Sequence, residues 1–411
     1  MSDPAWISAA LTAARPQAMA ALLRHFRDLD VAEGAYQDAA RRALRHWTRS
    51  GPPRDPTAWL ILVGRHAAPD GTRRREPPEE RLSNVEDAKG PLLAELDSEG
   101  YRDDLLRLLF ICCHPDLPAA EQIALALRVV CGLGVGQIAR AFLVSEAAME
   151  QHITRAKACI SRANVPVETP GPAERSARLE AVSAMIYLLF NEGYSALGPD
   201  ASRRHGLCDE AIRLARLLLR LFRGEPEIMA LTALLLLQHS RSEARLDAAG
   251  HIVLLEDQDR GRWNRAMIEE GLALSERAVQ LGRPGPYQIQ AAIASLHAAA
   301  PTPMDTDWTQ IERLYASLER LQPSPVVTLN RAVALARTQG PAPALELIET
   351  LAGPLGSYFY FHGVRGALLK DLGRAGEARE AFNRAIAVAG NPAEAAHIRT
   401  QLDRLTPVST T

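Results

Sequence analysis

The stretch VGQIARAFLVSEAAMEQHITRAKACIS, residues 135–161, decides the fold. Apolar residues at helical spacing predict one helix over Val135–Phe142 and a second over Ser145–Ser161. Only Leu143-Val144 joins the two helices, and the hydroxyl that opens the second can cap it. So short a turn is typical of a helix-turn-helix unit. In DNA-binding versions of this unit the capped helix enters the major groove.

These two helices have an inward face and an exposed face, and a third helix is predicted just before them over Glu121–Leu133. The expected inward residues are Ile138, Phe142, Val144, Met149, Ile153 and Ala156, and the expected exposed residues are Gln151, His152, Thr154, Arg155 and Lys157. Many helical hairpins share this spacing. From the stretch alone, both DNA binding and simple helix packing are therefore open.

The composition predicts an all-α fold. The chain has 411 residues, of which 47% are hydrophobic and 5% aromatic. Leu and Ala dominate, and runs of β-branched or aromatic residues are almost absent, which favours helices over strands. At about 100–200 residues per domain, two to four domains are expected.

Charge and cysteine content indicate a reduced, cytoplasmic protein. The net charge of −2 gives no strong overall field for nucleic acid. Five cysteines without a CxxC pair favour reduced thiols. No signal peptide is recognised, and the longest apolar run, Ile228–Leu237, is too short to span a bilayer.

The sequence over positions 1–75 predicts a small helical domain that ends in an arginine cluster. Helices are expected over Gln17–Leu29, from a cap at Asp30 to Trp47, and over Thr57–Gly64. The cluster contains Arg65, His66, Arg73 and Arg74. It could bind phosphate groups, or it could be a solvated helix end. The segment at 76–100, rich in Pro, Glu, Asp, Gly and Ser, predicts an acidic flexible linker.

Two further helical regions follow the helix-turn-helix domain, which we place at residues 101–165. Three prolines and a glycine at 165–172 end that domain. Helices are expected throughout a middle domain at 173–285, and a repeat follows in a domain at 286–411. Residues 330–335 align with residues 364–369 at an offset of 34, the period of a tetratricopeptide repeat. Stacked helical pairs of this kind can bind peptides, or can pack only within the chain.

The order of these parts resembles a sigma factor of the extracytoplasmic-function group of the sigma-70 family. Residues 30–39 (DVAEGAYQDA) resemble the region 2 helix that docks on RNA polymerase, residues 56–65 (PTAWLILVGR) the following helix, and residues 127–157 region 4. Five more motifs are similar to those of a subgroup with a C-terminal tetratricopeptide-like extension: residues 109–115, 186–194, 254–260, 282–287 and 323–332. In that subgroup the extension is thought to regulate the sigma core in cis.

The resemblance implies three binding sites and two partners, core RNA polymerase and promoter DNA. The polymerase-binding residues would be Gln37, Asp38 and Arg41. The −10 DNA-binding residues would be Arg65, His66, Arg73 and Arg74. The −35 DNA-binding residues would be Ser145, Gln151, His152, Arg155 and Lys157, at base edges or phosphates. A protein or peptide could bind the repeat domain. No catalytic residue, metal, cofactor or membrane is expected.

Several residues admit another interpretation. Trp59 could stack on an unpaired base, but a large ring in mid-helix is expected to pack in the core. Cys112-Cys113-His114 suggests metal ligands, yet it lacks a second spaced pair, so packing is preferred. An enzyme is not favoured, because no nucleophile or cofactor motif accompanies the polar residues at 191–194 or at 256–259. Buried polar contacts are the expected role of both segments.

The main alternative to a sigma factor is an adaptor that kept the sigma fold without initiating transcription. Pro69 and Glu150 favour it, because both depart from the family pattern. A proline within a helix costs about 3 kcal/mol, so the helix that would read the −10 element is expected to end early. The carboxylate of Glu150 would repel phosphate. The intact order of both sigma domains opposes the adaptor.

Overall fold

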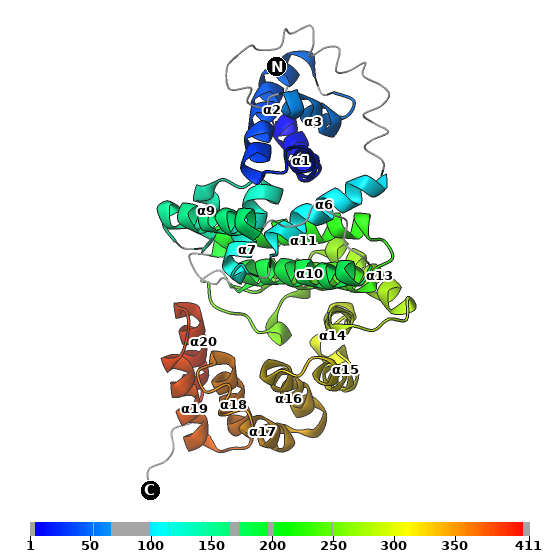
Figure 1. Cartoon of the computed structure of the whole chain (residues 1–411). Coiled ribbons are helices and arrows are strands. Elements are labelled where there is room, and N and C mark those ends of the chain that lie inside the picture. Colours follow the sequence, from blue (N-terminus) through cyan, green and yellow to red (C-terminus); the bar gives the residue numbers. More distant parts are fainter. Residues whose placement is uncertain are drawn as a thin grey trace. The chain divides into compact units, whose positions relative to one another are not determined.

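The computed structural model describes residues 5–51, 53–66, 98–114, 116–142, 144–163, 172–195, 201–247 and 250–405. Within these ranges the fold is all-α, as predicted, and the only β pairing is an isolated bridge between Leu246 and Ile252. The chain divides into two compact units, Met1–Leu189 and Phe190–Thr411. Figure 1 labels most of the helices. In the described part, no helix is long and apolar enough to cross a membrane.

Three helices begin the first unit: α1 (Ala5–Phe26), α2 (Leu29–Ser50) and α3 (Pro56–His66). Helix α1 packs against both of the others. Trp47 and Trp59 are buried between them, edge to face with ring centroids 5.3 Å apart. The expectation that Trp59 belongs to the core is therefore confirmed.

The N-cap of α2 is Asp28, so the predicted cap at Asp30 is wrong. The Asp28 carboxylate accepts a hydrogen bond from the backbone N–H of Val31 at 2.9 Å. The chain reverses at Arg27, whose φ is +55°, and Asp28 is already extended with φ −135°. Because this turn is so short, Asp30 falls inside the first helical turn, where its side chain can pair with other groups.

The rest of the first unit contains the helix-turn-helix. Its elements are α6 (Ser98–Cys112), α7 (Ala119–Ala126), the π-helix η1 (Leu127–Cys131), α8 (Val135–Phe142) and α9 (Glu146–Ala163). Helix α10 (Pro172–Tyr194) follows and crosses the boundary between the units. The predicted linker lies mostly outside the described residues, although α6 already begins at Ser98.

The predicted single helix over Glu121–Leu133 is wrong in detail. Its α-helical part begins at Ala119, and from Leu127 the chain continues as a π-helix that ends at Cys131. Gly132, with φ +81°, ends it in the left-handed conformation that favours glycine.

Cys112 and Cys113 are buried, and burial raises the pKa of the Cys113 thiol to about 12.

The predicted inward face of the helix-turn-helix is largely confirmed, with Val144 as the exception. Ile138, Met149, Ile153 and Ala156 are buried, and Phe142 is half-buried. Val144 is 40% exposed, because it lies in the turn, where its backbone N–H donates to the carbonyl of Ala139 at 3.0 Å. A helical spacing rule does not apply to a turn residue, so the prediction for Val144 is wrong.

The second unit is a succession of helices and short 3₁₀ turns. The helices are α11 (Ala201–Leu221), α12 (Pro226–His239), α13 (Arg265–Gln280), α14 (Pro286–Ala299), α15 (Trp308–Leu321), α16 (Pro325–Gln339), α17 (Pro341–Glu349), α18 (Phe359–Asp371), α19 (Ala375–Ala387) and α20 (Pro392–Asp403). Helices α11, α12 and α13 correspond to those expected in the middle domain. Prolines in the first turn begin several of these helices, where a missing N–H costs no hydrogen bond.

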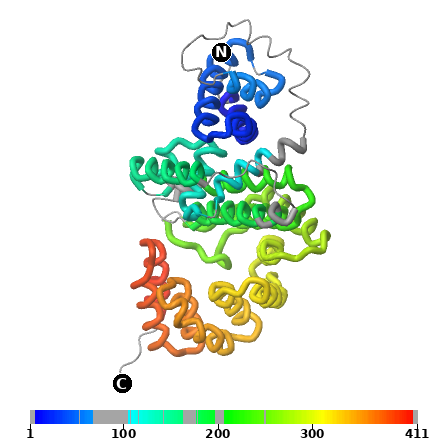
Figure 2. Tube along the Cα trace, viewed as in Figure 1, coloured from blue at the N-terminus to red at the C-terminus, as the bar shows by residue number. Residues whose placement is uncertain are grey.

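The offset of 34 holds for the starts of two helix pairs, which follow one another in the C-terminal part of the tube in Figure 2, coloured from orange to red. Helices α16 and α18 begin at positions 325 and 359, and 359 − 325 = 34. Helices α17 and α19 begin at positions 341 and 375, and 375 − 341 = 34. The equivalent residues Ala344 and Ala378 are both fully buried. A Cβ on Gly366 would lie 2.5 Å from the ring of Phe382, so glycine allows α18 and α19 to approach closely.

Polar contacts join the end of α10 and the segment before α13 to the rest of the second unit. Arg241 donates to the Tyr194 hydroxyl at 2.8 Å, and Arg260 donates to the carbonyls of His297 and Ala300, both at 2.7 Å. Glu256 pairs with Arg337 of α16. The polar contacts expected of these segments are therefore present, but the expected burial is wrong for Glu256, because nearly half of its side chain is exposed.

The close approach at Gly366 yields a stability prediction. Gly366→Ala should lower the free energy of unfolding of the second unit by about 1–3 kcal/mol, because the new methyl group must displace the Phe382 ring. Gly376→Ala is the matched control, since a Cβ there would meet nothing within 4 Å. Urea unfolding of the full-length chain, followed by circular dichroism, measures both. Equal stability of the two variants would contradict the packing at Gly366.

Candidate nucleic-acid and polymerase interface

The helix-turn-helix is built by local hydrogen bonds at both helix starts. The Ser145 hydroxyl accepts from the backbone N–H of Ala148 at 3.2 Å, which confirms that it can cap α9. The Gln137 side chain accepts from the backbone N–H of Gly134 at 2.8 Å, at the start of α8. A Cβ on Gly136 would lie 2.3 Å from the Glu146 carboxylate. Glycine therefore lets the first turn of α9 lie close against α8.

Part of the predicted −35 site is gathered on one face of α9. Gln151 and Arg155 line an open hollow of about 480 Å³ together with Ala147, Glu150 and Thr154. The Arg155 side chain is 64% exposed. Amide and guanidinium groups on an exposed helix face are the groups that read base edges or hold phosphates, although the carboxylate of Glu150 would repel phosphate in the same hollow.

His152 and Arg155 are also tied to α7. The Nδ1 atom of His152 lies 3.2 Å from the Glu121 carboxylate and 3.0 Å from the Arg155 guanidinium. When Nδ1 carries a proton it donates to Glu121, and when it does not it accepts from Arg155. Glu121 therefore helps to set which way these two side chains are oriented.

Lys157 has a different environment from the one predicted. It is expected on the exposed face, but its side chain is only 18% exposed and donates to Asp30 at 2.6 Å and to Glu33 at 2.8 Å, both on α2. Burial alone would lower the pKa of Lys157, but the hydrogen bonds to the two carboxylates outweigh burial and raise it. In this structure Lys157 is bound to the first helical domain and is turned away from the role predicted for it.

The predicted polymerase-binding residues share one face of α2. Gln37 is exposed and donates to Glu33 at 3.3 Å. Asp38 forms ion pairs with Arg42 at 2.9 Å and with Arg41 at 3.6 Å. The structure thus brings Gln37, Asp38 and Arg41 together, within a network of pairs that belongs to their own helix. Nothing in this geometry tests whether they bind polymerase, so that role stays a prediction.

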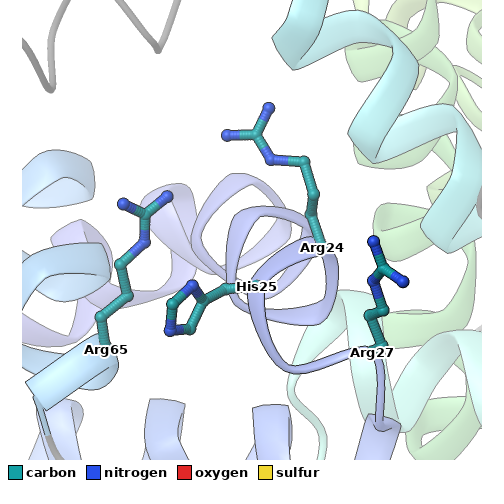
Figure 3. Close-up of a pocket in the computed structure, with 4 residues that line it drawn as sticks. All are labelled: Arg24, His25, Arg27 and Arg65. Atoms are coloured by element: carbon teal, nitrogen blue, oxygen red, sulfur yellow. The ribbon is translucent and has the colours of Figure 1, made fainter.

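Of the side chains predicted to bind the −10 element, Arg65 lies in a basic pocket. The pocket has a volume of about 610 Å³ and is lined by Arg24 and His25 from the last turn of α1, by Arg27 just after it, and by Arg65 from the end of α3. Figure 3 shows the imidazole of His25 between Arg24 and Arg65. His66 is exposed at the end of α3, whereas Arg73 and Arg74 lie outside the described residues. Such a pocket suits an anionic group such as a phosphate.

The backbone at this pocket is strained. Among the described residues other than glycine, only Arg27 has a positive φ, +55°. This conformation costs a residue with a Cβ about 1–2 kcal/mol. The strain places Arg27 beside Arg24, which itself pairs with Asp104 at 3.2 Å. An unfavourable backbone that gathers like charges is a feature often found at functional sites.

Sequence reasoning missed Arg24, His25 and Arg27 as candidates. The signal was present as three basic side chains close together at the end of α1. Basic side chains are common in the last turn of a helix, where they face the negative end of its dipole, so this run does not stand out. What the sequence did not show is that α3 ends beside them, so that Arg65 joins the same pocket.

Comparisons with known proteins agree with the helix-turn-helix assignment. Residues 107–160 match the family model "Sigma-70, region 4", and residues 178–279 match "Family of unknown function (DUF6596)". No solved structure matches the chain. "Uncharacterized protein R00370" of Rhizobium meliloti (strain 1021) is 62% identical over 410 residues, which covers 98% of this chain and 97% of that protein. The chain therefore belongs to the same protein family as this relative, and its residues 107–160 form a sigma-70 region 4 domain with a sigma-factor-like DNA-binding role.

Proposed function

We propose that the protein is a sigma factor of the extracytoplasmic-function type, which binds core RNA polymerase and directs promoter-specific initiation of transcription. The observation that carries the proposal is the region 4 helix-turn-helix, whose capped helix α9 presents Gln151 and Arg155 on an exposed face. The three-helix domain α1–α3 stands before it in the chain, where a sigma factor has region 2.

The basic pocket supports the same proposal. A sigma factor must hold the unpaired non-template strand of the −10 element, and single strands are held by stacking and by neutralised phosphates. Arg24 and Arg27, at the end of α1, and Arg65, at the end of α3, supply positive groups around this pocket, and α3 is the helix that resembles the −10-reading helix. With Trp59 in the core, binding through phosphates is the more suitable role for this domain.

The C-terminal helices are proposed to regulate the sigma domains in cis. The matched helix pairs α16–α17 and α18–α19, whose starts share the offset of 34, support a tetratricopeptide-like extension. The relative from Rhizobium meliloti aligns over 97% of its length, so the sigma-like part and the extension occur together in both proteins. A protein or peptide ligand of the repeats would act through the same extension.

A second candidate function is an adaptor that kept the sigma fold without initiating transcription. The pairing of Lys157 with Asp30 and Glu33 favours it, because this cation is then unavailable to DNA. Glu150 in the hollow on α9 points the same way.

Run-off transcription with purified core polymerase separates the two functions, with DNA from upstream of the protein's own gene as template. A discrete transcript that requires the protein supports the sigma factor. Failure to bind the polymerase supports the adaptor.

Deletion of residues 290–411 should change the amount of transcript while residues 1–165 stay folded, and an unchanged amount would remove the proposed regulation.

The exposed face of α9 yields a prediction on promoter binding. Arg155→Ala should weaken binding of the holoenzyme to its promoter by about 1–3 kcal/mol, roughly 5- to 150-fold, because a guanidinium contact to a base or phosphate is lost. Arg320→Ala, which removes an exposed arginine from α15, is the control. Electrophoretic mobility shift measures both, and equal affinities would argue against DNA binding by this face.

Replacement of Arg27 should raise the stability of the protein and weaken its binding to single-stranded DNA. Arg27→Gly should raise the free energy of unfolding by about 0.5–1 kcal/mol, because relief of about 1–2 kcal/mol of left-handed strain exceeds the entropic cost of glycine. The same variant should bind single-stranded DNA more weakly, with the salt dependence of log K reduced by about 0.7 if one phosphate contact is lost.

Fluorescence anisotropy at several salt concentrations and urea unfolding measure these two effects. Arg54→Gly, at an exposed loop residue that does not line the pocket, is the control. An unchanged salt dependence in Arg27→Gly would exclude a phosphate at this residue.

A further inference from the structure

Glu33 of α2 is a buried carboxylate that binds two cations of the region 4 domain. It is 4% exposed. It forms an ion pair with Arg128 of η1 at 2.9 Å and accepts a hydrogen bond from Lys157 of α9 at 2.8 Å. Lys157 also pairs with Asp30, one turn earlier on α2. We call Asp30, Glu33, Arg128 and Lys157 the Glu33 network.

A second contact joins the same two domains beside this network. Arg15 of α1 donates to the backbone carbonyls of Val129 at 3.0 Å and Arg128 at 3.1 Å. These carbonyls lie in the last turn of η1, where helical partners run out and a cation is favourable. A Cβ on Gly132 would lie 2.6 Å from Arg15, so glycine at this position makes room for the guanidinium. The end of a region 4 helix is thus capped by the first domain.

The Glu33 network occupies the face of α2 that is predicted to dock on polymerase. Four residues form one stripe along α2, because they follow one another at steps of three, four and four along the chain: Asp30, Glu33, Gln37 and Arg41. Gln37 is hydrogen-bonded to Glu33 within that stripe. A partner that covers Gln37 and Arg41 therefore lies against the groups that hold Lys157 and Arg128.

We propose that the Glu33 network holds the region 4 domain on α2 in the free protein, and that core polymerase must displace it in order to dock on the same stripe. The inference rests on the proposed sigma function, since it names polymerase as the competitor. The inference names the residues that regulate docking. Glu33 holds the region 4 domain on α2 in what we call the closed state, and separation of Lys157 from Glu33 makes Lys157 accessible to DNA.

The chemistry of the network suits a contact that opens. The Asp30 side chain is 73% exposed, so water and salt reach the edge of the network and weaken its ion pairs. The cations of region 4 can also bind phosphate. When the region 4 domain leaves α2, these cations therefore exchange the carboxylates of α2 for the phosphates of DNA.

The closed state can be trapped chemically in the full-length protein. A water-soluble carbodiimide joins a lysine amine and an adjacent carboxylate into an amide, and the carbodiimide takes up the water. The chain has three lysines, Lys89, Lys157 and Lys370, so cross-linked peptides are readily assigned by mass spectrometry. We expect Lys157 joined to Asp30 or Glu33 in the free protein. With saturating core polymerase, the yield should fall at least tenfold.

Binding to polymerase without DNA gives a second readout. Lys157→Gln weakens the network from the region 4 side and leaves the stripe on α2 intact, so its affinity for core polymerase should rise threefold or more. Lys157→Arg keeps a cation at this position and should restore the weaker binding, while its cross-link is lost because guanidinium does not couple. Glu180→Gln, an exposed carboxylate on α10, is the control for altered charge.

The outcomes separate the inference from the proposed function. Absence of the cross-link in the free protein, or an undiminished cross-link in the saturated complex, overturns the inference. An affinity of Lys157→Gln equal to that of the unmodified protein overturns it as well. Failure of the protein to bind polymerase at all overturns the proposed sigma function, and the competition with it, whatever the cross-link yield.

Discussion

The pairing of the buried Glu33 carboxylate is a physical constraint on how the two domains of the first unit contact each other. A charged group removed from water must be paired, because an unpaired buried charge is among the most costly features that a fold can contain. Glu33 meets this requirement with Arg128 and Lys157, which come from the region 4 domain. The three-helix domain α1–α3 therefore cannot keep Glu33 paired in this way without the region 4 domain, unless another cation or water takes its place.

The end of η1 shows the same principle with backbone groups. A helix leaves its last carbonyls without partners, and here the π-helical turn ends at Gly132 with a positive φ. Arg15 reaches two of these carbonyls and also lies over the Tyr36 ring, 4.5 Å from its centroid. Burial lowers the pKa of this guanidinium, although Tyr36 and Glu33 oppose that effect. Local helix geometry thus creates the acceptors that a second domain satisfies.

Local features were predictable from the sequence, and contacts between distant residues were not. Ser145 could be identified as a cap because a cap bonds within its own first turn, and the repeat could be found because equal offsets produce equal packing. The pairing of Lys157 with Glu33 joins residues 124 positions apart, so helical spacing could only place Lys157 outside. The basic pocket was missed for the same reason, since Arg24 and Arg65 belong to different helices. The prediction that Val144 faces inward was wrong because a turn does not follow helical periodicity.

Net charge is a poor guide to nucleic-acid binding in this protein because the charges are locally sorted. A chain with a net charge of −2 nonetheless gathers Arg24, Arg27 and Arg65 around one pocket. Elsewhere it pairs cations internally, as at Glu33. An arginine or lysine can bind DNA only when its position leaves it accessible, and here Lys157 is only 18% exposed because it pairs with Asp30 and Glu33 of α2. The decisive quantity is therefore the competition between internal carboxylates and external phosphates for the same cations, which composition does not report.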